Sequence, residues 1–257
     1  MLELSHISKT FAAGTPDAHK VFDDFSLTVA DGEFVSVIGS NGSGKTTMLN
    51  LVCGSLAVDE GKILFNGKDI TAMPEYKRAK KIGRVFQDPK IGTCADLTIL
   101  ENMALADNKN KSFGLVPAVN NKRISYYKEL LAACEMGLEN RLGTRVGSLS
   151  GGQRQALALV IANMTDLEML ILDEHTAALD PRSSETIMQL TDKFVRPRGL
   201  TTLMVTHNLR FALEYGTRLV MMHEGKCVLD LSGEEKENAK MDDLLKIFNQ
   251  ISIECGN

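Results

Sequence analysis

The stretch Gly39-Ser40-Asn41-Gly42-Ser43-Gly44-Lys45-Thr46 decides the fold class of this chain. It matches G-x-x-x-x-G-K-[ST], the pattern of a loop that wraps phosphate groups. A β-like apolar run, residues 34–38, precedes the loop, and residues 46–53 after it are predicted to form a helix. Glycines let backbone N–H groups face an anion at close range, and the helix N-terminus adds the positive end of its dipole. This order of strand, loop and helix predicts a nucleotide-binding α/β fold rather than a chance glycine-rich turn.

Two side chains at the end of this loop have specific predicted roles. Lys45 is expected to reach the β- and γ-phosphates of a nucleotide, and the Thr46 hydroxyl is expected to ligate Mg²⁺. The predicted nucleotide-binding residues of the loop are Gly39, Ser40, Asn41, Gly42, Ser43, Gly44, Lys45, Thr46 and Thr47.

Composition limits the classes of protein to which the chain can belong. Its 257 residues suffice for one large α/β domain, or for a core with a small inserted subdomain. The net charge is −4 and no long Lys/Arg run occurs, so no nucleic-acid partner is expected. No apolar stretch approaches the roughly 18 residues that span a bilayer, and the N-terminus lacks the features of a secretion signal. We therefore expect a cytoplasmic chain whose membrane role, if any, depends on a partner.

The cysteines point to the same compartment. The five residues are scattered and none forms a C-x-x-C pair, so metal or redox chemistry is not expected of them. Isolated thiols in odd number fit a reducing compartment.

Apolar periodicity predicts the order of the strands. Residues 2–4 and 25–29 alternate as half-buried strands do, with a loop at 12–17 between them. A strand and turn are expected at 61–68, and another strand at 82–86. The continuous apolar runs 169–172 and 201–205 suit parallel strands covered on both faces. An edge hairpin is expected around Glu224-Gly225, followed by a terminal helix at 241–248.

Helical spacing interrupts this pattern in the middle of the chain. Residues 97–106 and 124–136 have helical spacing, and the polar segment 107–121 between them is expected to be a loop. Residues 92–155 are therefore predicted to form a helical insert.

A second motif, this one acidic, completes the predicted nucleotide site. Residues 169–172 are apolar and are followed by Asp173 and Glu174. Asp173 is expected to hold the hydration shell of Mg²⁺. Glu174 points in a different direction and is expected to polarise the water that attacks the γ-phosphate. Two solvated acids at the end of a strand are the alternative, which the presence of the phosphate loop makes the weaker one.

The segment Leu149-Ser150-Gly151-Gly152-Gln153 resembles the signature of the ATP-binding-cassette (ABC) family. It precedes a predicted helix, 154–163, and lies upstream of the Asp-Glu strand. A serine, two glycines and a helix N-terminus make an anion site, and a plain helix cap is the alternative. The resemblance implies that this segment covers the γ-phosphate of ATP bound to a second subunit, so that two chains enclose two ATP molecules head to tail.

The same resemblance, which spans nearly the whole chain, implies further roles. Phe11 resembles the aromatic residue that stacks on adenine, although Phe22 and Phe25 are nearby. Gln87 matches the glutamine that touches Mg²⁺ or the attacking water and couples to the membrane partner. His207 resembles the switch histidine that contacts the γ-phosphate. The loop that links the two sites across the dimer corresponds to Ala178, Leu179 and Asp180.

Two features depart from the family pattern. His175 follows Glu174 where the family usually has proline, and it either shifts the pKa of the base or, as we favour, merely turns the chain. The 107–121 loop is longer than expected, and it either contacts a partner or is plain surface.

The resemblance implies an α/β fold with a P-loop (RecA-like) nucleotide-binding core, an N-terminal antiparallel β subdomain and an inserted α-helical subdomain. One ABC ATPase domain, 1–257, is expected, with the core at 1–91 and 156–257 and the helical subdomain at 92–155. The implied reaction is ATP hydrolysis to ADP and phosphate. The catalytic residues are expected to be Glu174, His207 and Gln87, and the metal ligands Thr46, Gln87 and Asp173.

The implied partners follow from the same resemblance. A homodimer, or a pair with a closely related ATPase subunit, is expected to work with an integral-membrane permease and an extracytoplasmic solute-binding protein. The chain is expected at the inner face of the cell membrane, in a prokaryotic importer of a small organic solute such as an aromatic amino acid. A lipoprotein-releasing or efflux ATPase and a scaffold for iron–sulfur assembly are the alternatives. A genome-maintenance ATPase would need a coiled-coil insert or zinc cysteines, which are missing.

Overall fold

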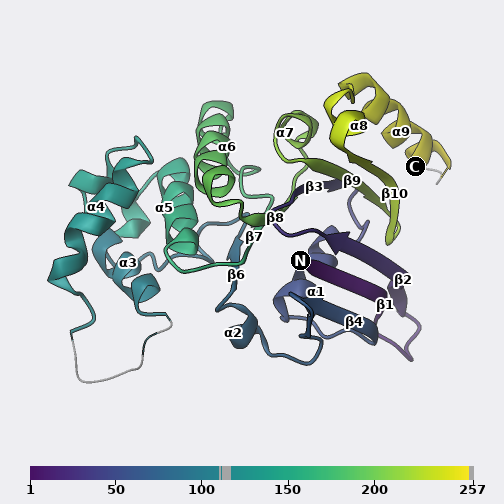
Figure 1. Ribbon diagram of the computed structural model, residues 1–257, viewed down its shortest axis with the longest axis horizontal. Coiled ribbons are helices and arrows are strands. Elements are labelled where there is room, and N and C mark those ends of the chain that lie inside the picture. The colour runs from purple at the N-terminus through teal and green to yellow at the C-terminus, as the bar shows by residue number, and fades with distance from the viewer. Residues whose placement is uncertain (110, 112–116, 255–257) are drawn as a thin grey trace. The chain divides into compact units, whose positions relative to one another are not determined.

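The computed structural model describes residues 1–109, 111 and 117–254 (Figure 1). The chain forms two compact units, residues 1–79 together with 199–257, and residues 80–198. The predicted helical segment 92–155 lies within the second unit, and its assignment as a separate subdomain stays a prediction. Within the described residues, no helix has the length and apolar character needed to cross a membrane.

An antiparallel sheet forms one layer of the first unit. Its strands are ordered β2-β1-β4-β5, with bounds β1 Leu2–Phe11, β2 His19–Val29, β4 Glu60–Phe65 and β5 Lys68–Asp69. Leu2, Leu4 and Ile7 of β1 are buried, and a register shift between Leu4 and Ile7 brings all three to the covered face. The alternating runs at 2–4 and 25–29 therefore predicted these strands correctly.

The second sheet of this unit holds the strand that leads into the phosphate loop. Strand β3, Phe34–Gly39, lies between β8, Thr201–Val205, and β9, Arg218–His223, and is parallel to both. Every residue of β3 is buried, as expected for a strand covered on both faces. Strand β10, Lys226–Ser232, pairs antiparallel with β9, which confirms the predicted hairpin.

Helices α1 Lys45–Cys53, α7 Leu209–Glu214, α8 Gly233–Glu237 and α9 Met241–Glu254 pack against this second sheet. The short helix α2, Glu75–Arg78, follows β5 in the chain. The predicted terminal helix is confirmed as the start of α9. Helices α7 and α9 pack with β3 and β9 in an apolar cluster of Ile38, Ala212, Leu219, Met221 and Leu244.

The second unit places helices beside two parallel strands. Strand β6, Ile82–Val85, pairs with β7, Met169–Asp173. The α-helices are α3 Ile99–Asp107, α4 Ile124–Ala132, α5 Gly151–Asn163 and α6 Pro181–Val195. Short 3-10 turns occur at η1 Asn121–Arg123, η2 Leu138–Asn140, η3 Val146–Ser148 and η4 Arg196–Arg198. The helical spacing predicted α3 and α4, with ends that differ by a few residues.

A buried carboxylate connects α3 to α4. Arg123 donates to both oxygens of Asp107, at 2.7 and 3.0 Å, and the Tyr127 hydroxyl donates to Oδ2 at 3.0 Å. Burial, followed by this hydrogen bond, raises the pKa of Tyr127 to about 12. These hydrogen bonds of Asp107 therefore hold the two ends of the predicted 107–121 loop together. Residues 110 and 112–116 of this loop lie outside the described part of the chain.

Candidate functional site

The phosphate loop connects β3 directly to α1. Gly44 is the N-cap of α1, with φ of 100° and ψ of −1°, and no side chain caps this helix end. The first N–H groups of a helix have no acceptor within the helix, so an uncapped N-terminus is an anion site. The local geometry therefore agrees with the prediction of a phosphate site.

The backbone of the loop has no room for a larger residue at its first position. Gly39 has φ of +151°, and a Cβ atom there would lie 2.2 Å from the carbonyl oxygen of Met222. Real Cβ atoms essentially never approach so closely, which means that β9 and the loop fit together only with glycine at this position.

The Lys45 ammonium lies inside the loop. It donates to the carbonyl oxygens of Gly39 at 2.8 Å and Ser40 at 2.7 Å, and to Ser43 Oγ at 3.3 Å. The side chain is buried, so its charge is held close to the loop and away from solvent. A cation in this position is suited to pair with phosphate oxygens.

The turn between β9 and β10 supports the loop from outside, which the sequence did not predict. Ser40 Oγ lies 3.3 Å from His223 Nδ1, and the Gly225 N–H donates to the Ser43 carbonyl at 3.1 Å. More than 180 residues separate Ser40 from His223, and only the pairing of β3 with β9 brings them together. A sequence signal for this contact would have required knowing the strand order.

His207 lies at the same edge of the sheet as the phosphate loop. It follows β8 by two residues, and β8 is the parallel neighbour of β3. The Thr206 N–H donates to the Val37 carbonyl at 3.1 Å, which fixes the start of this segment. Carboxyl ends of parallel strands form the ligand edge of such sheets, and the contact of His207 with a γ-phosphate stays a prediction.

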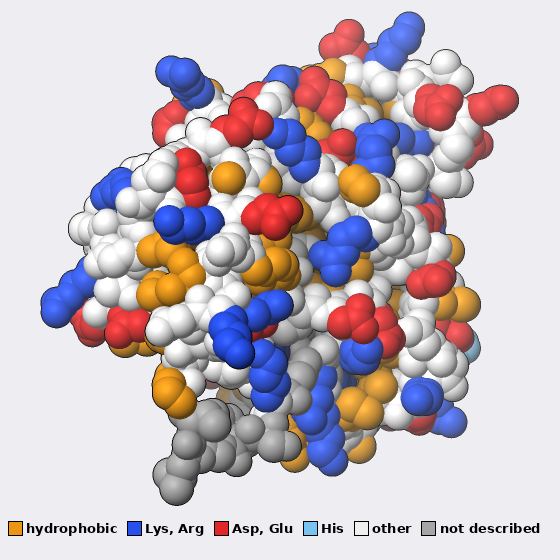
Figure 2. Space-filling model, turned by 60° about the vertical axis from the view of Figure 1, so that its left-hand side comes forward, with side chains coloured by type: hydrophobic (Ala, Val, Ile, Leu, Met, Phe, Trp, Pro, Cys, Tyr) orange, Lys and Arg blue, Asp and Glu red, His pale blue; other side chains and the backbone are white. Residues whose placement is uncertain are grey.

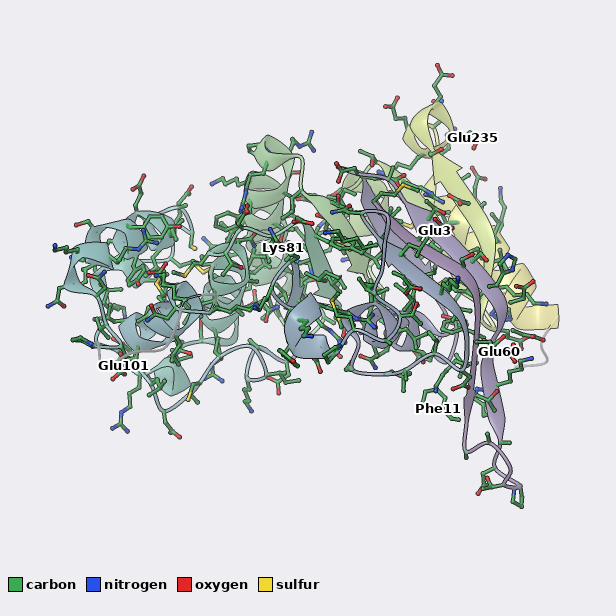
Figure 3. The ribbon with its side chains drawn as sticks, turned by 60° about the horizontal axis from the view of Figure 1, so that its bottom comes forward. Glu3, Phe11, Glu60, Lys81, Glu101 and Glu235 are labelled. Atoms are coloured by element: carbon green, nitrogen blue, oxygen red, sulfur yellow. The ribbon has the colours of Figure 1, made fainter. Side chains whose placement is uncertain are left out.

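Phe11 is the last residue of β1 and is 40% exposed (Figure 3). The Lys9 ammonium lies 5.9 Å from the centre of its ring. Phe22 and Phe25, the neighbours that made this assignment uncertain in sequence, are buried and stacked on each other at 4.6 Å. Of these three rings, Phe11 alone has the exposure that stacking on a base requires.

The second unit gathers three predicted residues at one edge. Asp173 is the last residue of β7, Glu174 follows it, and Gln87 comes two residues after β6. Strands β6 and β7 are parallel, with Val85 opposite Leu172, so their carboxyl ends coincide. Glu174 has φ of 47°, a left-handed conformation that turns the chain away from the strand direction. This agrees with the expectation that Asp173 and Glu174 point in different directions.

An unpredicted arginine pairs with Asp173. Arg84 Nη2 lies 2.6 Å from Asp173 Oδ2, and both side chains are 13% exposed. The guanidinium of Arg84 also stacks over the Phe86 ring at 4.7 Å. The two strands place this pair, because Arg84 lies opposite Ile171, two residues before Asp173 on the same face.

His175 is a core residue. Its Nε2 lies 3.2 Å from Thr191 Oγ1, and that hydroxyl donates to the Ile187 carbonyl at 2.8 Å. Because the threonine proton is already used, Nε2–H must be the donor to Thr191. Burial lowers the pKa of His175 to about 4, so the ring is neutral and ties the chain after β7 to α6.

The segment of Leu149 to Gln153 forms the start of α5. Ser150 Oγ accepts from the Gln153 N–H at 3.2 Å, and Gln153 Oε1 accepts from the Ser150 N–H at 3.3 Å. This reciprocal pair is a capping box. It contains the plain helix cap of the alternative interpretation, so the predicted contact with a second chain's nucleotide stays a prediction.

The predicted dimer-coupling loop lies beside this helix start. A Cβ atom on Gly151 would be 3.5 Å from Leu179 Cδ2, so the two segments are in van der Waals reach. Asp180 caps α6 by accepting from the Ser183 N–H at 3.0 Å. Hydrogen bonding by the Ser183 side chain, followed by this N–H, lowers the pKa of the Asp180 carboxyl. Ala178, immediately before Leu179, is exposed.

The donor set fits Mg²⁺ rather than a transition metal. Across the described residues, no group of three or more His, Cys, Asp or Glu could hold an ion alone. The predicted ligands are the hydroxyl of Thr46 in the first turn of α1, the amide of Gln87 after β6 and the carboxylate of Asp173 at the end of β7. Mg²⁺ prefers such oxygen donors and usually completes its shell with water and substrate phosphates.

Comparison with known proteins agrees with this geometry. The family model described as "ABC transporter" matches residues 22–177. A tyrosine transport ATP-binding protein of Clostridioides difficile is 44% identical over 248 residues, covering 96% of this chain and 98% of the relative. A thiamine import ATP-binding protein of Escherichia coli is 34% identical, covering 79% of this chain and 82% of that protein.

Solved structures show the same fold. An ABC transporter cassette in its ADP conformation has a TM-score of 0.81 at 27% identity, over 100% of this chain and 99% of its own. A dimeric cassette in a post-hydrolysis state with ADP and Pi has a TM-score of 0.77 at 29% identity, over 90% of this chain and 98% of its own. The family model, the near full-length relative and the phosphate loop lead to one conclusion: the chain belongs to the ABC transporter family and is an ATP-hydrolysing subunit of a transporter.

Proposed function

We propose that this ATPase drives the uptake of an aromatic amino acid through a separate membrane permease. The single observation that carries the proposal is the 44% identity, over nearly the full length of both chains, to a tyrosine transport ATP-binding protein. A relative for thiamine is named for import, which supports the proposed direction. No feature of the described residues favours lipoprotein release, efflux or iron–sulfur assembly over import.

Each residue of the proposed site has its own role in catalysis. Lys45 and the N–H groups of the phosphate loop bind the β- and γ-phosphates, and Phe11 stacks on adenine. Glu174 polarises the attacking water, and His207 contacts the γ-phosphate. Thr46, Gln87 and Asp173 hold Mg²⁺, which when bound neutralises the charge that develops on the phosphates.

Two chains are proposed to act together on each nucleotide. In the head-to-tail arrangement, residues Leu149 to Gln153 of one chain cover the γ-phosphate held by the phosphate loop of the other. The dimeric cassette with ADP and Pi supports a dimer for this family. Isolated subunits are therefore expected to be monomeric without ATP and to dimerise when hydrolysis is blocked.

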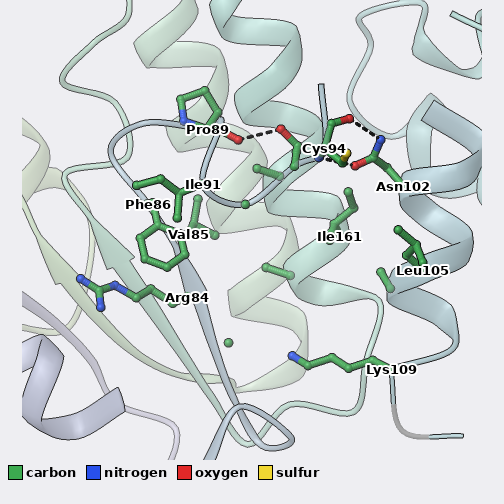
Figure 4. Close-up of a pocket in the computed structure, with 16 residues that line it drawn as sticks. Arg84, Val85, Phe86, Pro89, Ile91, Cys94, Asn102, Leu105, Lys109 and Ile161 are labelled. Atoms are coloured by element: carbon green, nitrogen blue, oxygen red, sulfur yellow. Dashed lines mark hydrogen bonds between the residues drawn. The ribbon is translucent and has the colours of Figure 1, made fainter. Parts of the chain in front are cut away.

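A groove in the second unit is the proposed docking site of the permease. It has a volume of about 590 Å³ and is lined by the end of β6, the segment after Gln87, α3 and α5 (Figure 4). Ile91 and Leu105 in its wall are 65% and 55% exposed, which is high for large apolar side chains. An apolar groove beside helices suits a short partner helix, here one from the cytoplasmic side of the permease.

Nucleic acid is not among the proposed partners. The face in Figure 2 shows acidic, basic and hydrophobic side chains interspersed, in keeping with the net charge of −4. The permease would hold the subunit at the inner membrane face, with a solute-binding protein on the other side supplying the substrate.

Reconstitution with the permease tests the function directly. The complex in vesicles should take up labelled tyrosine or phenylalanine when ATP is supplied on the side of the ATPase. Glu174→Gln should keep ATP binding, lose about 10²–10⁴ in turnover and stop uptake. ATP-dependent transport of an unrelated solute only, or outward transport, would reject the proposed substrate or direction.

Crosslinking tests the docking site separately. Cys94 is exposed and lines the groove, whereas Cys134 is buried in the same unit. A variant that keeps only Cys94 should crosslink to the permease in an ATP-dependent manner, and a variant that keeps only Cys134 should not. Equal crosslinking of both variants, or of neither, would place the permease elsewhere.

A further inference from the structure

The contacts of Arg84 connect two parts of the second unit that otherwise have separate tasks. One end of its guanidinium bonds Asp173 Oδ2 at 2.6 Å. Its Cζ atom lies over the Phe86 ring, 4.7 Å from the ring centre, and both Arg84 and Phe86 line the groove described above (Figure 4). The same side chain thus touches the predicted Mg²⁺ carboxylate and forms part of the groove wall.

The ion pair leaves the other carboxylate oxygen available. Arg84 occupies Oδ2 of Asp173, and both side chains are 13% exposed, so the rotation of the carboxylate is restricted. Carboxylates that bind metals are commonly oriented by hydrogen bonds from residues that do not touch the metal. A fixed carboxylate loses less rotational freedom when an ion arrives.

We propose that Arg84 is a positioning residue that orients Asp173 toward Mg²⁺ and, through Phe86, links this orientation to the groove. This proposal deepens the assignment of Asp173 as a metal ligand and of the groove as the permease site, on which it rests. A partner that moves the Phe86 ring would shift the guanidinium, and with it the carboxylate.

Arginine has properties here that lysine lacks. Its planar group can donate to a carboxylate and stack on an aromatic face at the same time, because the two interactions use its edge and its face. A lysine ammonium would keep the positive charge near Asp173 without holding both contacts in one rigid unit. The sequence alone gave no reason to single out this residue of β6.

The test measures how Mg²⁺ binds to protein saturated with a non-hydrolysable ATP analogue, by calorimetry and by Mn²⁺ electron paramagnetic resonance. Arg84→Met should raise the Mg²⁺ concentration for half-saturation about 10-fold, and should broaden the Mn²⁺ spectrum. Affinity for the analogue in EDTA should stay within about twofold of wild type. Phe86→Leu, which keeps the ion pair but removes the stacking, should raise the half-saturation about threefold.

A matched control removes the same charge at the other end of the strand. Lys81 directly precedes β6 and pairs with Glu168 at 2.9 Å, so Lys81→Met should leave Mg²⁺ binding unchanged. If Arg84→Met does not fold, Arg84→Lys tests the proposal in its place. This variant should raise the Mg²⁺ concentration for half-saturation about threefold, because the fork geometry of the guanidinium is lost.

Other outcomes reject the idea cleanly. An unchanged half-saturation in folded Arg84→Met, or in Arg84→Lys, would show that Asp173 needs no positioning. A lower half-saturation would show that Arg84 competes with the metal. Failure of the wild type to bind Mg²⁺ with the nucleotide would instead contradict the proposed metal site itself.

Discussion

The phosphate loop and the segment at Ser150 both place glycines at the start of a helix, yet they cap that helix differently. At the phosphate loop the N-cap is Gly44, in a left-handed conformation, with no side chain on the helix N–H groups. At α5 the N-cap is Ser150, and its capping box with Gln153 already occupies donors at the helix start. Only the phosphate loop also encloses a buried cation, Lys45.

This difference separates two kinds of helix start. The N–H groups of the phosphate loop have no capping side chain and suit an anion, whereas those at Ser150 are capped within their own chain. An uncapped N-terminus leaves its first N–H groups to hydrogen-bond water or a ligand. A capped N-terminus has no such need, and a bound phosphate adds to an already stable helix. The phosphate loop is therefore expected to dominate nucleotide affinity in the monomer, and the Ser150 segment to act in the dimer.

The largest expected effect comes from removing the cation. Lys45→Ala should weaken Mg·ATP binding by about 100-fold, because two charge-assisted contacts to phosphate are lost. Calorimetry on the monomer measures this, and Ser150→Arg in the same assay should bind nearly as wild type. Similar losses in both variants would remove the distinction between the two segments.

A second comparison uses one glycine from each segment. Gly39→Ala forces a Cβ atom to within 2.2 Å of a backbone oxygen, whereas a Cβ on Gly151 meets only Leu179 Cδ2 at 3.5 Å. We expect Gly39→Ala to lower the free energy of unfolding by about 3 kcal/mol, from overpacking and backbone strain together. Gly151→Ala should change it by less than about 0.5 kcal/mol. Thermal and urea unfolding measure both, and equal destabilisation would contradict the packing at Gly39.

The two segments also show what the sequence could and could not predict. Local patterns predicted β3, α1 and α5, because each depends on residues close in sequence. Contacts between distant residues were missed. His223 reaches Ser40, and Arg84 reaches Asp173, only through strand pairings that periodicity does not specify. The short helices α7 and α8 were missed because five or six residues carry too little periodicity to detect.

The histidines of the two units differ as well, since His207 is exposed and His175 is buried. Burial lowers the pKa of His175 from 6.5 to about 4. Between these values the unfolded chain binds a proton that the folded chain excludes, so stability falls as pH decreases through this window. The free energy of unfolding should fall by about 2 kcal/mol between pH 7 and pH 5 because of this group.

Chemical unfolding at several pH values checks this dependence. His175→Gln keeps a donor for Thr191 without a titratable group, and its stability should lose less than the wild type between pH 7 and pH 5. A wild type and variant with the same pH slope would show that other groups control acid stability.

The smallest expected effect comes from Ser150→Ala, which distinguishes the role of Ser150 as a helix cap from its proposed role in binding phosphate. Ser150→Ala removes the hydroxyl that accepts from Gln153 N–H and should cost about 1 kcal/mol of stability. Thr98→Ala is the matched control, because Thr98 forms the same capping box with Glu101 at the start of α3 in the same unit. Both variants should lose similar stability, measured by urea unfolding.

Turnover at saturating ATP, under conditions where both are fully folded, should fall in Ser150→Ala alone, since only that hydroxyl is proposed to meet a second chain's phosphate. Equal turnover in the two variants would leave Ser150 as a helix cap and nothing more.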